Sequence, residues 1–159
     1  LNKPVVIRYP RGGQDENVKF EEHQEIELGK SEILKEGKDI SIIAIGKRVA
    51  DAMKMAEKYK KEDGIEAEVI NARFLKPLDD NTIIESIKKT KNVITIEDGT
   101  IINGLATAVK EVVVNNNLQG VKIKSYAYPD EFIKHGSVDE LEKIYGLDEE
   151  NIINGVNKS

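Results

Sequence analysis

Short apolar runs alternate with amphipathic stretches over most of the chain, and each run ends in glycine or polar residues. The run at 39–46 is almost continuously apolar and ends in glycine, which is typical of a strand buried on both faces of a parallel sheet. Further runs predict strands over 66–71, 92–96 and 121–126. Between the runs, apolar residues recur at helical spacing and predict helices over 48–61, 81–90 and 104–114. Two short helices, 138–145 and 148–156, follow an irregular loop at 129–137.

This alternation predicts an α/β fold, a three-layer α/β/α sandwich around a mainly parallel sheet of about five strands. In such folds ligands bind beyond the carboxyl ends of the strands. If this domain has a site of its own, we expect it among the polar residues there, which are those at 46–48, 72–74, 97–99 and 128–130.

A separate apolar run, Val5 to Ile7, leads into Arg8, Pro10, Arg11 and two glycines. Guanidinium groups bind phosphate or carboxylate through a planar fork of donors, so this segment indicates an anion site. The alternative is a turn whose arginines are solvated or ion-paired. Because the run lies at the extreme N-terminus without an initiator Met, we expect it to be the tail of a larger structure. The polar stretch at 14–38 is interpreted as a linker with one or two short strands.

Three further residues are candidates for chemistry, and each has a structural alternative. Glu97, beside Asp98 at a strand end, is placed as a general acid or metal ligand would be, or it caps the following helix. Arg73 would hold an anion or organise its loop. His135 is a conceivable general acid, although a loop histidine hydrogen-bonded to a helix N-terminus is the simpler interpretation. Ser137 and Glu140 fit a capping box.

Composition narrows the class of protein. Of 159 residues, 39% are hydrophobic and 33% charged, and no apolar run is long enough to cross a bilayer. A net charge of −5 without a basic stripe argues against nucleic acid as a partner. The absence of cysteine rules out disulfides and thiolate metal sites, and we expect a cytoplasmic protein. Dinucleotide, P-loop and nucleophile-elbow motifs do not occur after any predicted strand, so the residues alone give no complete catalytic set.

Five segments taken together carry a family resemblance. In order and spacing they resemble the C-terminal third of 1-deoxy-D-xylulose-5-phosphate synthases, and the similarity covers nearly the whole chain. R-Y-P-R-G and P-D-E-F-I-K-H-G-S are the most discriminating motifs, whereas N-A-R-F-L-K-P-L-D has looser relatives among transketolase-like enzymes. The segments are 8–12, 43–46, 71–79, 95–99 and 129–137.

The resemblance implies a domain division and an activity. It implies the end of a pyrimidine-binding domain at 1–13, a linker at 14–38 and a transketolase C-terminal domain at 39–159, whose mixed sheet has one antiparallel strand. The full enzyme of this family condenses pyruvate with glyceraldehyde 3-phosphate, releases CO2 and supplies isoprenoid, thiamine and pyridoxal biosynthesis. Its thiamine diphosphate and Mg2+ are held by two preceding domains, whose motifs do not occur here, and the whole enzyme is a dimer.

The same resemblance makes Arg8 or Arg11 the contact for the phosphate of the acceptor aldehyde, while Arg73, Glu97 and His135 are possible supporting or loop-organising residues. No catalytic residue and no metal ligand are expected, and the isolated chain is predicted to be inactive. One departure weakens any specific role for Asp98, because Asp98, Gly99 and Asn103 stand where relatives often have Glu, Asn and Gly.

Two alternatives remain open at this point. The chain would instead be the C-terminal domain of another thiamine diphosphate enzyme, such as a 2-oxoacid dehydrogenase β subunit. Alternatively, it is a regulatory module that stands alone and binds an organic anion at the strand ends.

Overall fold

A five-stranded mixed sheet forms the centre of the computed structural model, which describes Pro4 and residues 25–156, with side chains as far as Ile152. The strand order is β1-β3-β2-β4-β5. β1 is antiparallel to β3, whereas the other three pairings are parallel. This confirms the predicted fold class, including its single antiparallel strand. The strands are β1 (Glu32–Lys35), β2 (Ile40–Ala44), β3 (Ala67–Asn71), β4 (Asn92–Thr100) and β5 (Lys122–Tyr128).

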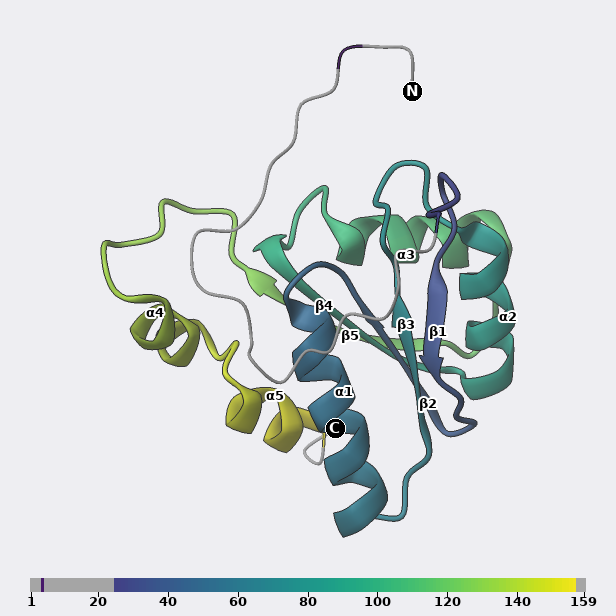
Figure 1. Ribbon diagram of the computed structural model, residues 1–159, viewed down its shortest axis with the longest axis horizontal. Coiled ribbons are helices and arrows are strands. Elements are labelled where there is room, and N and C mark those ends of the chain that lie inside the picture. Colours follow the sequence, from purple (N-terminus) through teal and green to yellow (C-terminus); the bar gives the residue numbers. More distant parts are fainter. Residues whose placement is uncertain (1–3, 5–24, 157–159) are drawn as a thin grey trace.

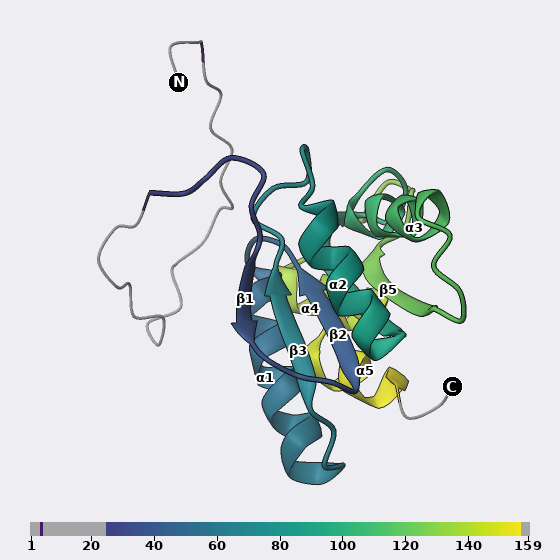
Figure 2. The ribbon, with the colours of Figure 1, turned by 90° about the vertical axis from the view of Figure 1, so that its right-hand side faces the viewer.

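Helices cover both faces of this sheet (Figures 1 and 2). α1 and α5 contribute to the hydrophobic core on one face, and α2 and α3 to the core on the other. Neighbouring residues of the central strand β2 alternate between them, with Ile42 in the first core and Ile43 in the second, and both are fully buried. No described helix is long and apolar enough to pass through a membrane. The helices are α1 (Arg48–Glu62), α2 (Asp80–Thr90), α3 (Leu105–Asn115), α4 (Val138–Tyr145) and α5 (Glu149–Val156).

Local sequence signals define several helix ends. The predicted capping box is confirmed, because the Ser137 hydroxyl accepts from the Glu140 N–H while the Glu140 carboxylate accepts from the Ser137 N–H. Asp79 caps α2 by accepting from the Thr82 N–H. Gly64 follows α1 with a φ of 69°, a conformation that costs glycine little.

β4 is longer than predicted, and a short strand of the predicted linker joins the sheet. β4 continues to Thr100, four residues beyond the predicted end at Ile96. Its pairing with β5 is irregular between Ile96 and Thr100 and then resumes opposite Tyr128. β1, within the predicted linker, is an edge strand of the sheet itself. Arg8 and Arg11 lie outside the described residues, so the structure places neither of them.

Candidate functional site

The carboxyl edge of the parallel strands holds a cluster of charged side chains. We call Lys47, Arg48, Asp51, Asp98 and Glu142 the edge cluster. Lys47 follows β2, and its Nζ lies 3.2 Å from Asp98 Oδ1 and 3.2 Å from Glu142 Oε1. Burial lowers the pKa of Lys47, but the hydrogen bonds and charge of Asp98 and the hydrogen bond of Glu142 outweigh it and raise the pKa. This lysine is therefore charged and paired.

Arg48 is the most buried member of the edge cluster, with a side chain only 2% exposed. Its Nη2 lies 2.8 Å from Glu142 Oε1, and its Nη1 lies 3.0 Å from Asp51 Oδ2. Nη1 also donates to the backbone carbonyl of Leu147 at 3.3 Å. A buried guanidinium needs such partners, and here they come from α1, α4 and the turn after α4. Arg48 consequently ties the C-terminal part of the fold to the carboxyl edge.

Glu97 is buried at the same edge but turns toward α3. Its two carboxylate oxygens accept from the N–H groups of Leu105 at 2.9 Å and Ala106 at 3.0 Å. Such donors have no partner inside a helix, and a carboxylate is favourable beside them. Gly104 makes the approach possible, because a Cβ there would lie 2.1 Å from Glu97 Oε2. The carboxylate is thus the N-terminal cap of α3.

Arg73 belongs to a different part of the edge. Its Nη2 lies 2.6 Å from Glu32 Oε2 at the start of β1. Next to this pair, the Ser31 N–H donates to Asp79 Oδ2 at 3.0 Å. Together these contacts hold the segment that leads into β1 against the loop between β3 and α2. Arg73 thus organises this junction.

His135 lies in the loop between β5 and α4, in a stretch where every residue from 131 to 140 is exposed. At the base of this loop the rings of Tyr128 and Tyr145 pack edge to face, with centroids 5.5 Å apart. Among the residues singled out from the sequence, Arg73 contacts β1, Glu97 contacts α3 and His135 is in the exposed loop. The structure does not assemble them into one site.

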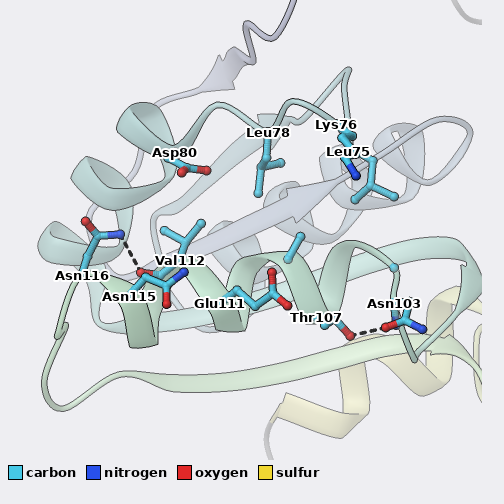
Figure 3. A pocket seen from close by; sticks show the side chains of 12 residues that line it. Leu75, Lys76, Leu78, Asp80, Asn103, Thr107, Glu111, Val112, Asn115 and Asn116 are labelled. Carbon is cyan, nitrogen blue, oxygen red and sulfur yellow. Dashed lines mark hydrogen bonds between the residues drawn. The ribbon is translucent and has the colours of Figure 1, made fainter.

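A groove of about 380 Å³ lies between α3 and the loop that leads into α2 (Figure 3). The Asn116 amide on its wall donates to the Val112 carbonyl, and the Thr107 hydroxyl accepts from the Asn103 N–H. These polar groups serve the ends of α3. The charged residues along the groove are of both signs, Lys76 with Asp80 and Glu111, so the groove has no preference for an anion.

Mg2+ bound to a diphosphate requires oxygen ligands that converge on one point. Within the described residues, no group of three or more His, Cys, Asp or Glu side chains is arranged to hold a metal ion. The N-terminus of α3, a possible anion site in principle, is taken by Glu97. The described residues therefore contain no cage of protein ligands for a metal ion, and Glu97 occupies this helix N-terminus.

The partnership of Arg48 with Glu142 was not visible in the sequence. The strand-end pattern drew attention to Lys47 and Arg48, but their principal partner comes 94 positions later than Arg48. The only local signal for Glu142 is its place on a short amphipathic helix, which many surface carboxylates share.

A family model supplies the assignment that the geometry alone does not. The model of the transketolase C-terminal domain matches residues 29–152. The chain belongs to this family. Its curated relatives include the 1-deoxy-D-xylulose-5-phosphate synthase of Halothermothrix orenii, 43% identical over 153 residues, and that of Desulfotalea psychrophila, 42% identical over 153 residues. The matches cover 96% and 94% of this chain, confirming the resemblance found in its motifs.

The chain spans about a quarter of the length of those relatives, since each match covers 24% of the relative. Among solved structures, it is similar to one described as a split-gene transketolase, an inactive beta4 tetramer. The TM-score is 0.78 at 32% identity, over 87% of this chain and 45% of that one. The transketolase of Campylobacter jejuni shares the fold, with a TM-score of 0.56 at 16% identity. That match covers 82% of this chain and 19% of the transketolase chain.

Proposed function

We propose that this chain is the C-terminal part of a 1-deoxy-D-xylulose-5-phosphate synthase. The complete enzyme would condense pyruvate with glyceraldehyde 3-phosphate, with loss of CO2. The observation that carries the proposal is the 43% identity to such a synthase over 96% of the chain. The synthase relatives are all matched over about a quarter of their length, as expected for one domain of a larger enzyme.

Within that enzyme, the described residues would serve assembly and not the chemical step. Both cations of the edge cluster are paired with carboxylates, and Glu97 is committed to α3. Thiamine diphosphate and Mg2+ would be bound by the preceding domains, and the whole enzyme would be a cytoplasmic homodimer. On this proposal the 159-residue chain alone has no activity. Incubating it with pyruvate, thiamine diphosphate and Mg2+ tests this, because measurable release of CO2 would contradict it.

Arg8 and Arg11 are the residues through which this chain would reach the substrate. We assign at least one of them to the phosphate of glyceraldehyde 3-phosphate, because a guanidinium fork binds a phosphate bidentately. The test uses the full-length enzyme with Arg8→Ala and Arg11→Ala made separately. At least one should raise the KM for glyceraldehyde 3-phosphate by about tenfold or more, as expected when a charge-assisted contact of about 1.5–3 kcal/mol is lost.

Two comparisons make this experiment specific. The KM for pyruvate should stay within about twofold, because that substrate has no phosphate. Lys19→Ala, which removes one positive charge from the same N-terminal region, should leave both constants unchanged. If neither arginine variant alters the KM for glyceraldehyde 3-phosphate, the assignment of the phosphate contact is wrong.

A further inference from the structure

The segment from Pro129 to Tyr145, comprising the exposed loop and α4, carries apolar side chains that nothing in the described fold covers. Phe132 is fully exposed, Ile144 is 72% exposed and Val138 is 52% exposed. α4 has no buried residue, although it is amphipathic. We call this stretch the 129–145 segment. Large exposed apolar side chains gathered in one short stretch are typical of an interaction surface.

The α4 part of this segment is fixed at several points. The capping box starts α4, and Gly146 ends it with a φ of 67°. Glu142 is paired with the buried Arg48 at 2.8 Å. The Tyr145 ring packs against Tyr128 of β5. An apolar surface held in place in this way loses little conformational entropy when a partner covers it, so it is organised for binding in advance.

We propose that the 129–145 segment is the docking surface for the domain that precedes this one in the enzyme, and the proposal rests on the function proposed above. The first argument is position. β1 runs antiparallel to β3, so the polypeptide reaches β1 at the carboxyl edge, where Glu32 pairs with Asn71. The 129–145 segment leaves the same edge after β5, as the ribbon shows (Figure 1).

One domain can lie on this edge and touch both regions. β1 and β5 are the two outer strands of the sheet, four spacings apart, or roughly 19 Å. A domain of 100 residues has a radius of gyration of about 13 Å, so its diameter exceeds that span. A preceding domain connected through residues 25–31 is therefore large enough to reach the 129–145 segment without any rearrangement of the sheet.

The second argument is area, and it favours a tethered domain over a second copy of the chain. The exposed apolar side chains of the segment amount to roughly 400 Å², about half of the ~800 Å² that each partner buries in a stable interface between separate molecules. A neighbour on the same polypeptide has an effective concentration on the order of millimolar, so a smaller contact is sufficient.

Cysteine labelling tests the proposal directly, because the chain contains no cysteine of its own. Phe132→Cys and Ile144→Cys report on the segment, and Val114→Cys on α3 is the control, since Val114 and Ile144 are both 72% exposed. Each variant is made in the 159-residue chain and in the full-length enzyme. The rate of maleimide modification at that position is followed by mass spectrometry of the peptide that contains it.

We expect all three cysteines to react at similar rates in the 159-residue chain. In the full-length enzyme, those at 132 and 144 should react at least about tenfold more slowly, because a docked site reacts only when it opens transiently. The cysteine at 114 should be unaffected. Equal rates in both proteins at 132 and 144 would overturn the proposal. So would protection already present in the 159-residue chain that increases with its concentration, which would identify a second copy as the occupant.

The activity of the unmodified full-length enzyme separates this proposal from the proposed function. Protected cysteines in an enzyme that does not form 1-deoxy-D-xylulose 5-phosphate would refute the synthase assignment and support the docking surface. An active enzyme with unprotected cysteines would refute the docking surface alone.

Discussion

Replacing Glu97 with glutamine tests whether this carboxylate is a helix cap or a group with a chemical role. The substitution preserves the shape of the side chain and removes its charge. Because both oxygens accept from backbone N–H groups, at 2.9 and 3.0 Å, one of them becomes an NH2 group that faces a donor. The variant should fold, but with the N-terminus of α3 incompletely satisfied.

The size of the effect follows from burial, since Glu97 is only 5% exposed. A buried donor left without a partner costs about 1–3 kcal/mol, and the lost interaction with the helix dipole adds up to about 2 kcal/mol. We expect the free energy of unfolding to fall by about 3 kcal/mol. For a chain of this length, that corresponds to a decrease in Tm of about 6–12 °C.

Urea unfolding at pH 7 measures this change, with Asp98→Asn as the control. The Asp98 side chain is 36% exposed, pairs with Lys47 at 3.2 Å and lies 3.5 Å from the buried Arg48, which keeps Asp51 and Glu142 as partners, so its loss should cost about 1 kcal/mol. A decrease below about 1 kcal/mol for Glu97→Gln would refute the capping argument. Loss of enzyme activity with unchanged stability would instead point to a chemical role.

Gly104→Ala adds an independent check on the same contact. The new Cβ would lie 2.1 Å from Glu97 Oε2 and 2.6 Å from the Thr100 carbonyl oxygen, so the carboxylate has to leave the cap. Once it has left, removing its charge should matter little. The double variant should therefore be more stable than the two separate losses predict, by at least about 1 kcal/mol. Additive losses would show that Glu97 and Gly104 act separately.

Substitutions at three further positions test other contacts. Arg48→Met should lower the free energy of unfolding by about 2 kcal/mol, which is less than the cost for a fully buried pair because the Glu142 side chain is 18% exposed. Limited proteolysis should then cut the 129–145 segment faster than in the unmodified chain. Arg48→Lys keeps the positive charge and should recover part of the lost stability. Burial alone would raise the pKa of Asp79, but hydrogen bonds from Ser31 and Thr82 outweigh burial and lower the pKa. The stability that the Asp79 carboxylate contributes is therefore fully present above the pKa of the unfolded chain, about 3.9, and is lost as the pH falls through the lower pKa of the folded chain. Asp79→Asn should consequently destabilise the chain at pH 7, and the difference from the unmodified chain should shrink in urea titrations at acid pH. Tyr126→Phe removes the hydroxyl that donates to the Ile152 carbonyl at 2.9 Å and should cost about 1 kcal/mol in thermal unfolding.

Hydrophobic pattern predicted the architecture because burial follows it closely here. All five residues of β2 are buried, and its four apolar residues contribute to cores on both faces, as the nearly continuous apolar run indicates. The end of β4 was harder to predict. Residues 97–99 have little strand propensity of their own, and the strand continues through them because Thr100 pairs with Tyr128 across the irregular register.

The roles of individual polar residues could not be predicted from the sequence, because they depend on partners that are distant in the chain and a local pattern does not identify such partners. A carboxylate that follows a strand is well placed both for acid–base chemistry and for capping the next helix, so the position of Glu97 fits either role. Gly104 was the available signal, since a small residue immediately before the helix allows the approach. Arg48 gave no comparable signal, because Glu142 belongs to another element.

The charge of the edge cluster bears on where an anionic substrate can bind. Two cations and three carboxylates leave it with one net negative charge, and Arg48, its strongest phosphate ligand by chemistry, is buried among those carboxylates. A phosphate brought within a Debye length of about 8 Å would be repelled by the cluster as a whole. On the proposed function, the phosphorylated substrate therefore needs its cationic contact from another segment. This is a further reason for our proposal that the phosphate contact is Arg8 or Arg11 of the R-Y-P-R-G motif and not a cation of the edge cluster.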